Sequence, residues 1–179
     1  MRPAALALLL LPSLALAQGR PRPAPDPGAR YDAPLALGLR LGGLVAYSSP
    51  AGAPTAVGGG VYGLFDLHGL IADLSADAYG GDKALQLAAG LGVYWPVAGE
   101  ASTTPYLGGG AKLAWVRFGG DGAFGLQPYL AVGLLAGRQW SPHIRLELAW
   151  FFDTMREREL NGGPSHLANG PMATLGLGF

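Results

Sequence analysis

Apolar side chains recur at every second position over most of the sequence after Pro34. A period of two is that of a β-strand, in which successive side chains leave opposite faces. From Leu35 to Tyr47, the odd-numbered positions are mostly large and apolar, whereas the even-numbered ones are mostly small and include Arg40. The same division recurs further along the chain and predicts eight strands. They span residues 35–47, 57–67, 70–79, 85–95, 106–115, 126–136, 144–153 and 171–179.

The two faces of these strands differ in a way that selects a class of fold. One face is bulky and almost uncharged, and the other is dominated by Gly and Ala with isolated charges. Small residues suit a narrow lumen better than a solvent coat, and a closed sheet pairs every backbone group, as lipid requires. The pattern therefore predicts an all-β protein: an eight-stranded antiparallel up-and-down transmembrane β-barrel. The alternative is a soluble, secreted, lipocalin-like barrel with the apolar face inside.

The connections between the strands differ in length. The segments Ser48–Thr55, Phe118–Ala123 and Thr154–Gly170 are long, whereas those near residues 68 and 141 are tight. With both chain ends on the periplasmic side, the long connections fall on the extracellular side, as is typical of transmembrane barrels. The connection from residue 96 to 104 is long for a periplasmic turn and is the exception.

The first 34 residues have a different composition. Arg2 precedes an apolar stretch that ends in Ala15-Leu16-Ala17, the pattern of a secretory signal peptide cleaved after Ala17. The stretch is shorter than the roughly 20 residues of a transmembrane helix. Residues 18–34 are rich in Pro, Gly, Ala and Arg, which is typical of a disordered leader. We therefore expect a signal peptide at 1–17, a Pro-rich leader at 18–34 and the barrel at 35–179.

Charge and cysteine content exclude several classes of protein. The 179 residues include 12 Lys and Arg against 12 Asp and Glu, so the formal net charge is zero and a nucleic-acid partner is not expected. The chain has no cysteine, which excludes a disulfide scaffold. We expect a monomer whose surroundings are outer-membrane lipids.

Three short stretches carry a resemblance to a known family. The chain ends in Ala173-Thr174-Leu175-Gly176-Leu177-Gly178-Phe179, which is apolar at alternate positions, and two further segments run from Pro105 to Gly110 and from Pro128 to Gly133. The last stretch resembles the C-terminal signal of bacterial outer-membrane barrels, and the two segments resemble strand starts in the small OmpA-like outer-membrane β-barrel family. The resemblance implies a Gram-negative outer membrane and a non-enzymatic structural or surface-interaction role. It also implies that the barrel assembly machinery recognises a C-terminal signal of Ala173, Leu175, Leu177 and Phe179.

Isolated charges on the small-residue face are expected to point into the lumen. The three cations and five carboxylates are Arg40, Asp66, Asp73, Asp77, Lys112, Arg145, Glu147 and Asp153. A charge in a narrow interior is costly unless it is paired or hydrated. We therefore expect a plug of ion pairs that includes Arg145 and Glu147. An ion path is the alternative, in which the protein is a small channel for ions or apolar solutes. Asp73 and Asp77 alone are a thin ligand set for a cation.

No motif indicates an enzyme, a cofactor or a metal site. Gly58, Gly60 and Gly63 match G-x-G-x-x-G but lie inside an alternating segment instead of between a strand and a helix. Ser141 and His143 are neighbours without an evident acidic partner. The three histidines are scattered along the sequence. The sequence therefore predicts no catalysis and no cofactor.

Overall fold

The computed structural model describes residues 35–179 except 68, 98–102, 137–141, 159–161 and 164. Eight long strands form a closed barrel in the order β1-β10-β7-β6-β5-β4-β3-β2. Their bounds are β1 Leu35–Val45, β2 Thr55–Asp66, β3 Ile71–Gly81, β4 Ala84–Pro96, β5 Thr103–Arg117, β6 Ala123–Ala136, β7 His143–Phe152 and β10 Asn169–Gly178. The described residues contain no helix that is long and apolar enough to span a membrane.

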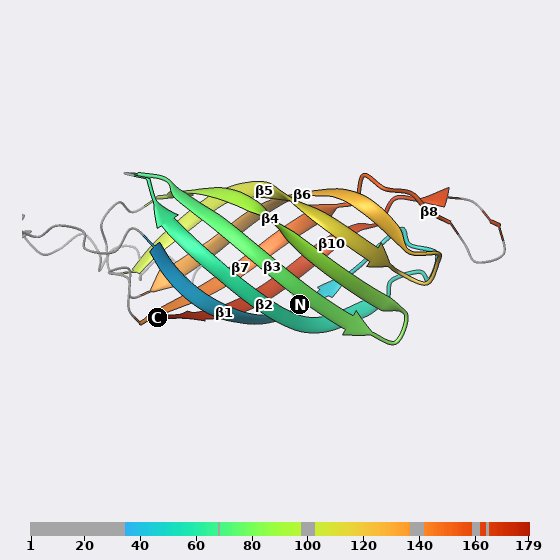
Figure 1. Ribbon diagram of the computed structural model, residues 1–179, viewed down its shortest axis with the longest axis horizontal. Coiled ribbons are helices and arrows are strands. Elements are labelled where there is room, and N and C mark those ends of the chain that lie inside the picture. Colours follow the sequence, from blue (N-terminus) through green and yellow to red (C-terminus); the bar gives the residue numbers. More distant parts are fainter. Residues whose placement is uncertain (1–34, 68, 98–102, 137–141, 159–161, 164) are drawn as a thin grey trace, which may run out of the picture. The chain divides into compact units, whose positions relative to one another are not determined.

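Consecutive long strands pair antiparallel, and the last strand closes the ring against the first. Leu39 of β1 lies opposite Leu177 of β10 and, on its other side, opposite Val61 of β2. Figure 1 shows the tilted strands wrapping around one axis, with the chain's C-terminus at one end. The predicted all-β fold and its eight strands are confirmed, with strand ends shifted by a few residues.

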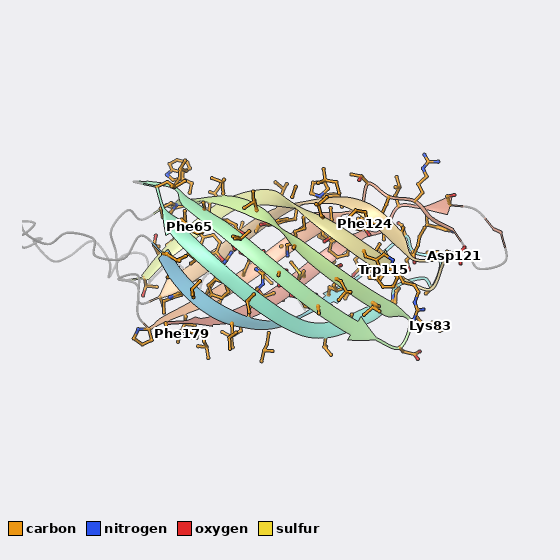
Figure 2. All side chains as sticks on the ribbon, viewed as in Figure 1. Phe65, Lys83, Trp115, Asp121, Phe124 and Phe179 are labelled. Atoms are coloured by element: carbon orange, nitrogen blue, oxygen red, sulfur yellow. The ribbon has the colours of Figure 1, made fainter. Side chains whose placement is uncertain are left out.

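The large apolar side chains point away from the barrel axis (Figure 2). Leu37, Leu87, Leu146 and Leu177 are each about half exposed, at 53%, 50%, 49% and 57%. In a lipocalin-like barrel these leucines would fill the centre, so that alternative is wrong for this chain. The outer surface is instead suited to hydrocarbon.

The two ends of the barrel differ. The end that holds the C-terminus has the short connection 67–70, in which the Leu67 N–H donates to the Leu70 carbonyl at 2.8 Å. The opposite end carries the connections 46–54, 118–122 and 153–168. The last of these contains a small hairpin that the sequence pattern did not predict, formed by β8 Glu157–Arg158 and β9 Ser165–His166. Two-residue strands are too short to show an alternating pattern.

Candidate functional site

Asp77 joins two cations in the middle of the lumen. The Arg40 guanidinium donates to both carboxylate oxygens, through Nε at 2.5 Å and through Nη2. Lys112 Nζ donates to Asp77 Oδ2 at 2.6 Å. The alternation of β1, β3 and β5 turns these three side chains inward, and all three are buried. Such charge-assisted, two-pronged pairing compensates the loss of hydration that burial imposes.

A second cluster lies beside the first and is centred on Arg145. Its Nη1 donates to Asp73 Oδ2 at 2.6 Å, and its Nη2 donates to Glu147 Oε2. Arg40 Nη1 lies 3.9 Å from the same Asp73 oxygen. The two clusters therefore form one network, the lumen network, of three cations and three carboxylates with no net charge. Its members are Arg40, Asp73, Asp77, Lys112, Arg145 and Glu147.

Tyrosine side chains enclose the lumen network. Arg145 Nε donates to the Tyr106 hydroxyl at 2.8 Å, and that hydroxyl donates to Glu147 Oε2 at 2.9 Å. The Arg145 guanidinium also lies 4.9 Å from the centre of the Tyr94 ring, and Lys112 Nζ lies 5.3 Å from that of Tyr129. Cation–π contacts of this kind are strongest where water is excluded. The tyrosines thus fill the space that hydration water would otherwise occupy.

Glycines on the neighbouring strands make room for these rings. Gly38 lies opposite Tyr62, and Gly133 lies opposite Tyr106. A methyl group at Gly38 would collide with the Tyr62 ring, and one at Gly133 would collide with the Tyr106 ring. Each ring therefore lies over a position where any larger residue would displace it.

Sequence reasoning did not assign a role to these tyrosines. Five of the seven tyrosines in the sequence occur on the small-residue face and are buried in the lumen: Tyr62, Tyr79, Tyr94, Tyr106 and Tyr129. Their restriction to one face is a signal that could have identified them as lumen residues that pack around the charged side chains.

Between the lumen network and the end opposite the C-terminus, the lumen is filled by amides and one carboxylate. The side chains of Gln86 and Gln127 exchange two hydrogen bonds of 3.2 Å. Gln127 Nε2 also donates to Asp153 Oδ1 at 2.7 Å. Beyond them the buried rings of Phe118 and Phe151 lie 6.3 Å apart between centroids. These two rings form an apolar layer on that side of the lumen network.

Two buried carboxyl groups at this end form no ion pair with any described residue. Asp153 Oδ2 and Glu157 Oε2 also have no hydrogen-bond partner within the described part of the chain. Burial raises the pKa of Asp153 to about 6, partly offset by the hydrogen bond from Gln127. Burial also raises the pKa of Glu157, although its carboxylate accepts the Phe118 N–H at 2.6 Å and Arg117 acts in the opposite direction. We call Asp153 and Glu157 the mouth carboxyls.

The structure places the sequence-predicted residues in three groups. Six of the eight lie in the lumen network described above. Asp153 faces the lumen but bonds to Gln127 and not to that network. The side chain of Asp66 lies outside the described part of the structure. The residues of the predicted C-terminal signal, Ala173, Leu175, Leu177 and Phe179, all face outward on or just after β10.

The described residues contain no cluster of three or more His, Asp or Glu that could hold a metal ion. His143 Nε2 shares a hydrogen bond of 2.9 Å with the Tyr62 hydroxyl, and Ser141 lies outside the described residues.

The barrel is similar to two solved structures of eight-stranded outer-membrane β-barrels. The crystal structure of Neisserial surface protein A (NspA) matches with a TM-score of 0.63 at 12% identity, over 82% of this chain and 98% of that one. The N-terminal β-barrel domain of Pseudomonas aeruginosa OprF matches with a TM-score of 0.50 at 12% identity, over 80% of this chain and 97% of that one. No family model and no curated protein matches the sequence. The likeness establishes the outer-membrane β-barrel fold that the resemblance implied.

Proposed function

We propose that this chain is a non-enzymatic outer-membrane protein with a plugged lumen and a structural or surface-interaction role. The observation that carries the proposal is the lumen network, in which six charged side chains pair across the barrel interior and none is left to attract a passing ion. Its members are nearly inaccessible, with 0% of Asp73, 2% of Arg145 and 2% of Lys112 exposed.

The space left beside the network supports the same proposal. A cavity next to Arg145, lined also by Leu64, Ile71, Tyr94, Tyr106 and Leu135, measures about 10 Å³. A single ordered water needs at least about 10–15 Å³. A hydrated ion is larger still, and to pass it would have to separate the Arg145–Asp73 pair, which links β7 to β3 across the interior. A channel would therefore need a rearranged interior.

Location and processing form the second part of the proposal. The signal peptide at 1–17 directs export, residues 18–34 form the leader, and residues 35–179 insert as a monomer in the outer membrane. The outward-facing residues of β10, with Phe179 at the end, are recognised by the barrel assembly machinery. The apolar outer surface and the fold shared with NspA and OprF support this location.

Conductance of the purified barrel in planar lipid bilayers tests the plug. We expect no stepwise currents from the wild-type protein, with a porin of larger barrel size as the positive control. Stepwise currents from the wild-type protein at a reproducible amplitude would overturn the plugged lumen and favour the small channel.

A gel-shift assay on membrane fractions tests the location. Folded transmembrane barrels migrate differently before and after boiling, because the closed sheet resists detergent until heated. We expect this shift for protein recovered from the outer-membrane fraction. Recovery in the soluble fraction without detergent would contradict the membrane location.

A further inference from the structure

A shallow apolar depression lies on the outer surface of β2 to β6. Its volume is about 670 Å³. Its outward-facing lining includes Ala76, Ala78, Leu87, Leu113, Trp115 and Phe124. The hollow is present because the outward-facing side chains of β3 at this place are small. The larger side chains of β4, β5 and β6 form the wall on its other side. The hollow is suited to one acyl chain.

Two cations lie at the end of the same strands, above this depression. Arg117 follows Trp115 on the outward face of β5, and it lies opposite Leu85 of β4. Lys83 lies two residues before Leu85, in the turn between β3 and β4, and is exposed. Figure 2 shows Lys83, Trp115 and Phe124 toward the same end of the barrel. The two strands β4 and β5, whose outward-facing residues line the depression, are therefore each next to a cation at this end: Lys83 just before β4 and Arg117 at the end of β5.

Neither Lys83 nor Arg117 forms an ion pair within the described part of the chain, although Arg117 also acts electrostatically on the buried carboxyl group of Glu157. Arg40, Lys112 and Arg145, by contrast, all form ion pairs. The exposed carboxylates Asp82 and Asp121 lie at the same rim and do not pair with them. Two exposed cations above an apolar hollow complement a phosphate joined to an acyl chain.

We propose that Lys83 and Arg117 bind the phosphate of a phosphorylated glycolipid, one acyl chain of which occupies the depression on β2 to β6. This inference rests on the proposed function, because an outer-membrane location places this end of the barrel in the leaflet that contains such glycolipids. Of the described residues, every exposed cation (Lys83, Arg117 and Arg156) lies at this end, opposite the C-terminus. Such a site would hold one glycolipid molecule of that leaflet against the outer surface of the barrel.

Native mass spectrometry of the folded barrel, titrated with the phosphorylated glycolipid in detergent, tests the site. We expect one tightly retained glycolipid on the wild-type protein. The double variant Lys83→Gln/Arg117→Gln should bind about thirtyfold more weakly, since each cation near a lipid headgroup contributes about one kcal/mol. Arg156→Gln is the matched control, because Arg156 is an exposed cation in the segment after β7 and not above the depression, and it should bind like the wild type.

A second pair of variants tests the acyl-chain half of the site. Ala78→Leu fills the depression without touching the cations and should weaken retention severalfold. Ala72→Leu adds the same bulk on the outward face of β3, opposite Phe65 and outside the lining of the depression, and should leave retention unchanged. Chemically dephosphorylated glycolipid should bind the wild-type protein no better than the intact lipid binds the double variant.

Three outcomes would overturn the inference. The double variant could retain the glycolipid as well as the wild type does, or Arg156→Gln could weaken binding as much as the double variant does. The wild type could also retain an anionic phospholipid as well as it retains the glycolipid. The gel shift on boiling, measured for each variant, shows whether the barrel is folded in the outer membrane. A failure of the lipid site can therefore be distinguished from a failure of the proposed function. A barrel that folds and fractionates with the outer membrane but retains no glycolipid contradicts only the lipid site. A chain found in the soluble fraction contradicts the proposed function itself.

Discussion

Buried carboxylates have different partners in the middle of the lumen and at its mouth, which is the end opposite the C-terminus. In the middle, Asp77 meets Arg40 and Lys112, and Glu147 meets Arg145 and a tyrosine hydroxyl. At the mouth, Asp153 has one amide donor and Glu157 has a backbone donor, and neither forms an ion pair within the described part of the chain. Among the described residues, one oxygen each of Asp73, Asp153 and Glu157 lacks a hydrogen-bond partner, so the two regions differ in the pairing with cations and not in the number of hydrogen bonds.

The difference shows that burial alone does not decide what a charge does to stability. A buried pair that loses one member leaves an uncompensated charge, which is strongly destabilising. A buried carboxyl without a cation already bears part of that penalty in its ionised form, and a proton relieves it. Substitutions in the two regions should therefore change stability in opposite directions.

The largest effect is expected from Asp77→Asn. The amide keeps the shape of the carboxylate but leaves Lys112 buried without its ion-pair partner and Arg40 with only Asp73, 3.9 Å away. We expect the free energy of unfolding to fall by about 3–5 kcal/mol, measured by urea unfolding of the barrel in lipid vesicles. The exposed Asp82→Asn is the control and should change it by less than about 0.5 kcal/mol. Equal effects of the two would mean that the lumen network contributes nothing to stability.

The next largest effect is an increase in the free energy of unfolding when Asp153 is replaced, and its size depends on pH. Asp153 titrates near its ordinary value of 3.8 in the unfolded chain, and burial raises its pKa to about 6 in the folded barrel. Between these values the folded state holds a proton that the unfolded state has released. The free energy of unfolding therefore falls as pH rises through this window and stays lower above it.

Asp153→Asn removes the titrating group while keeping an oxygen for Gln127. At pH 8 we expect the variant to be more stable than the wild type by up to about 3 kcal/mol, and at pH 3 the two should be nearly equal. Urea unfolding at both pH values measures the difference. A variant that is less stable at pH 8 would show that the ionised carboxylate stabilises the mouth after all.

The smallest effect concerns the glycines that hold the tyrosines. Gly133→Ala would push a methyl group into the Tyr106 ring and toward the Leu146 carbonyl. We expect a loss of about 1–3 kcal/mol from overpacking. Gly80→Ala is the matched control, because a methyl group there meets open space and the backbone is not in the left-handed region. Thermal unfolding of both variants measures the difference, and a loss of equal size at Gly80 would show that the collision with the Tyr106 ring is not the cause.

The alternation of large and small residues was enough to predict the barrel and which way its faces point. Leu37 and Leu177 face outward and Arg40 and Arg145 face inward because the strand period of two leaves no other choice once one face is bulky. The pattern could not predict the β8–β9 hairpin, whose strands are two residues long. It also could not separate Asp153 from the other lumen charges, since alternation assigns a face but not a partner.

The sequence by itself thus determined the number of strands, their faces and the set of side chains that share the interior. Only the tertiary structure decided which of them meet. Arg40 and Asp77 are 37 positions apart, and Asp73 and Arg145 are 72 apart, on strands that never pair directly. Their contacts depend on how a closed ring staggers its strands and on where glycines let tyrosines settle. Those are properties of the whole sheet, which no local stretch of residues contains.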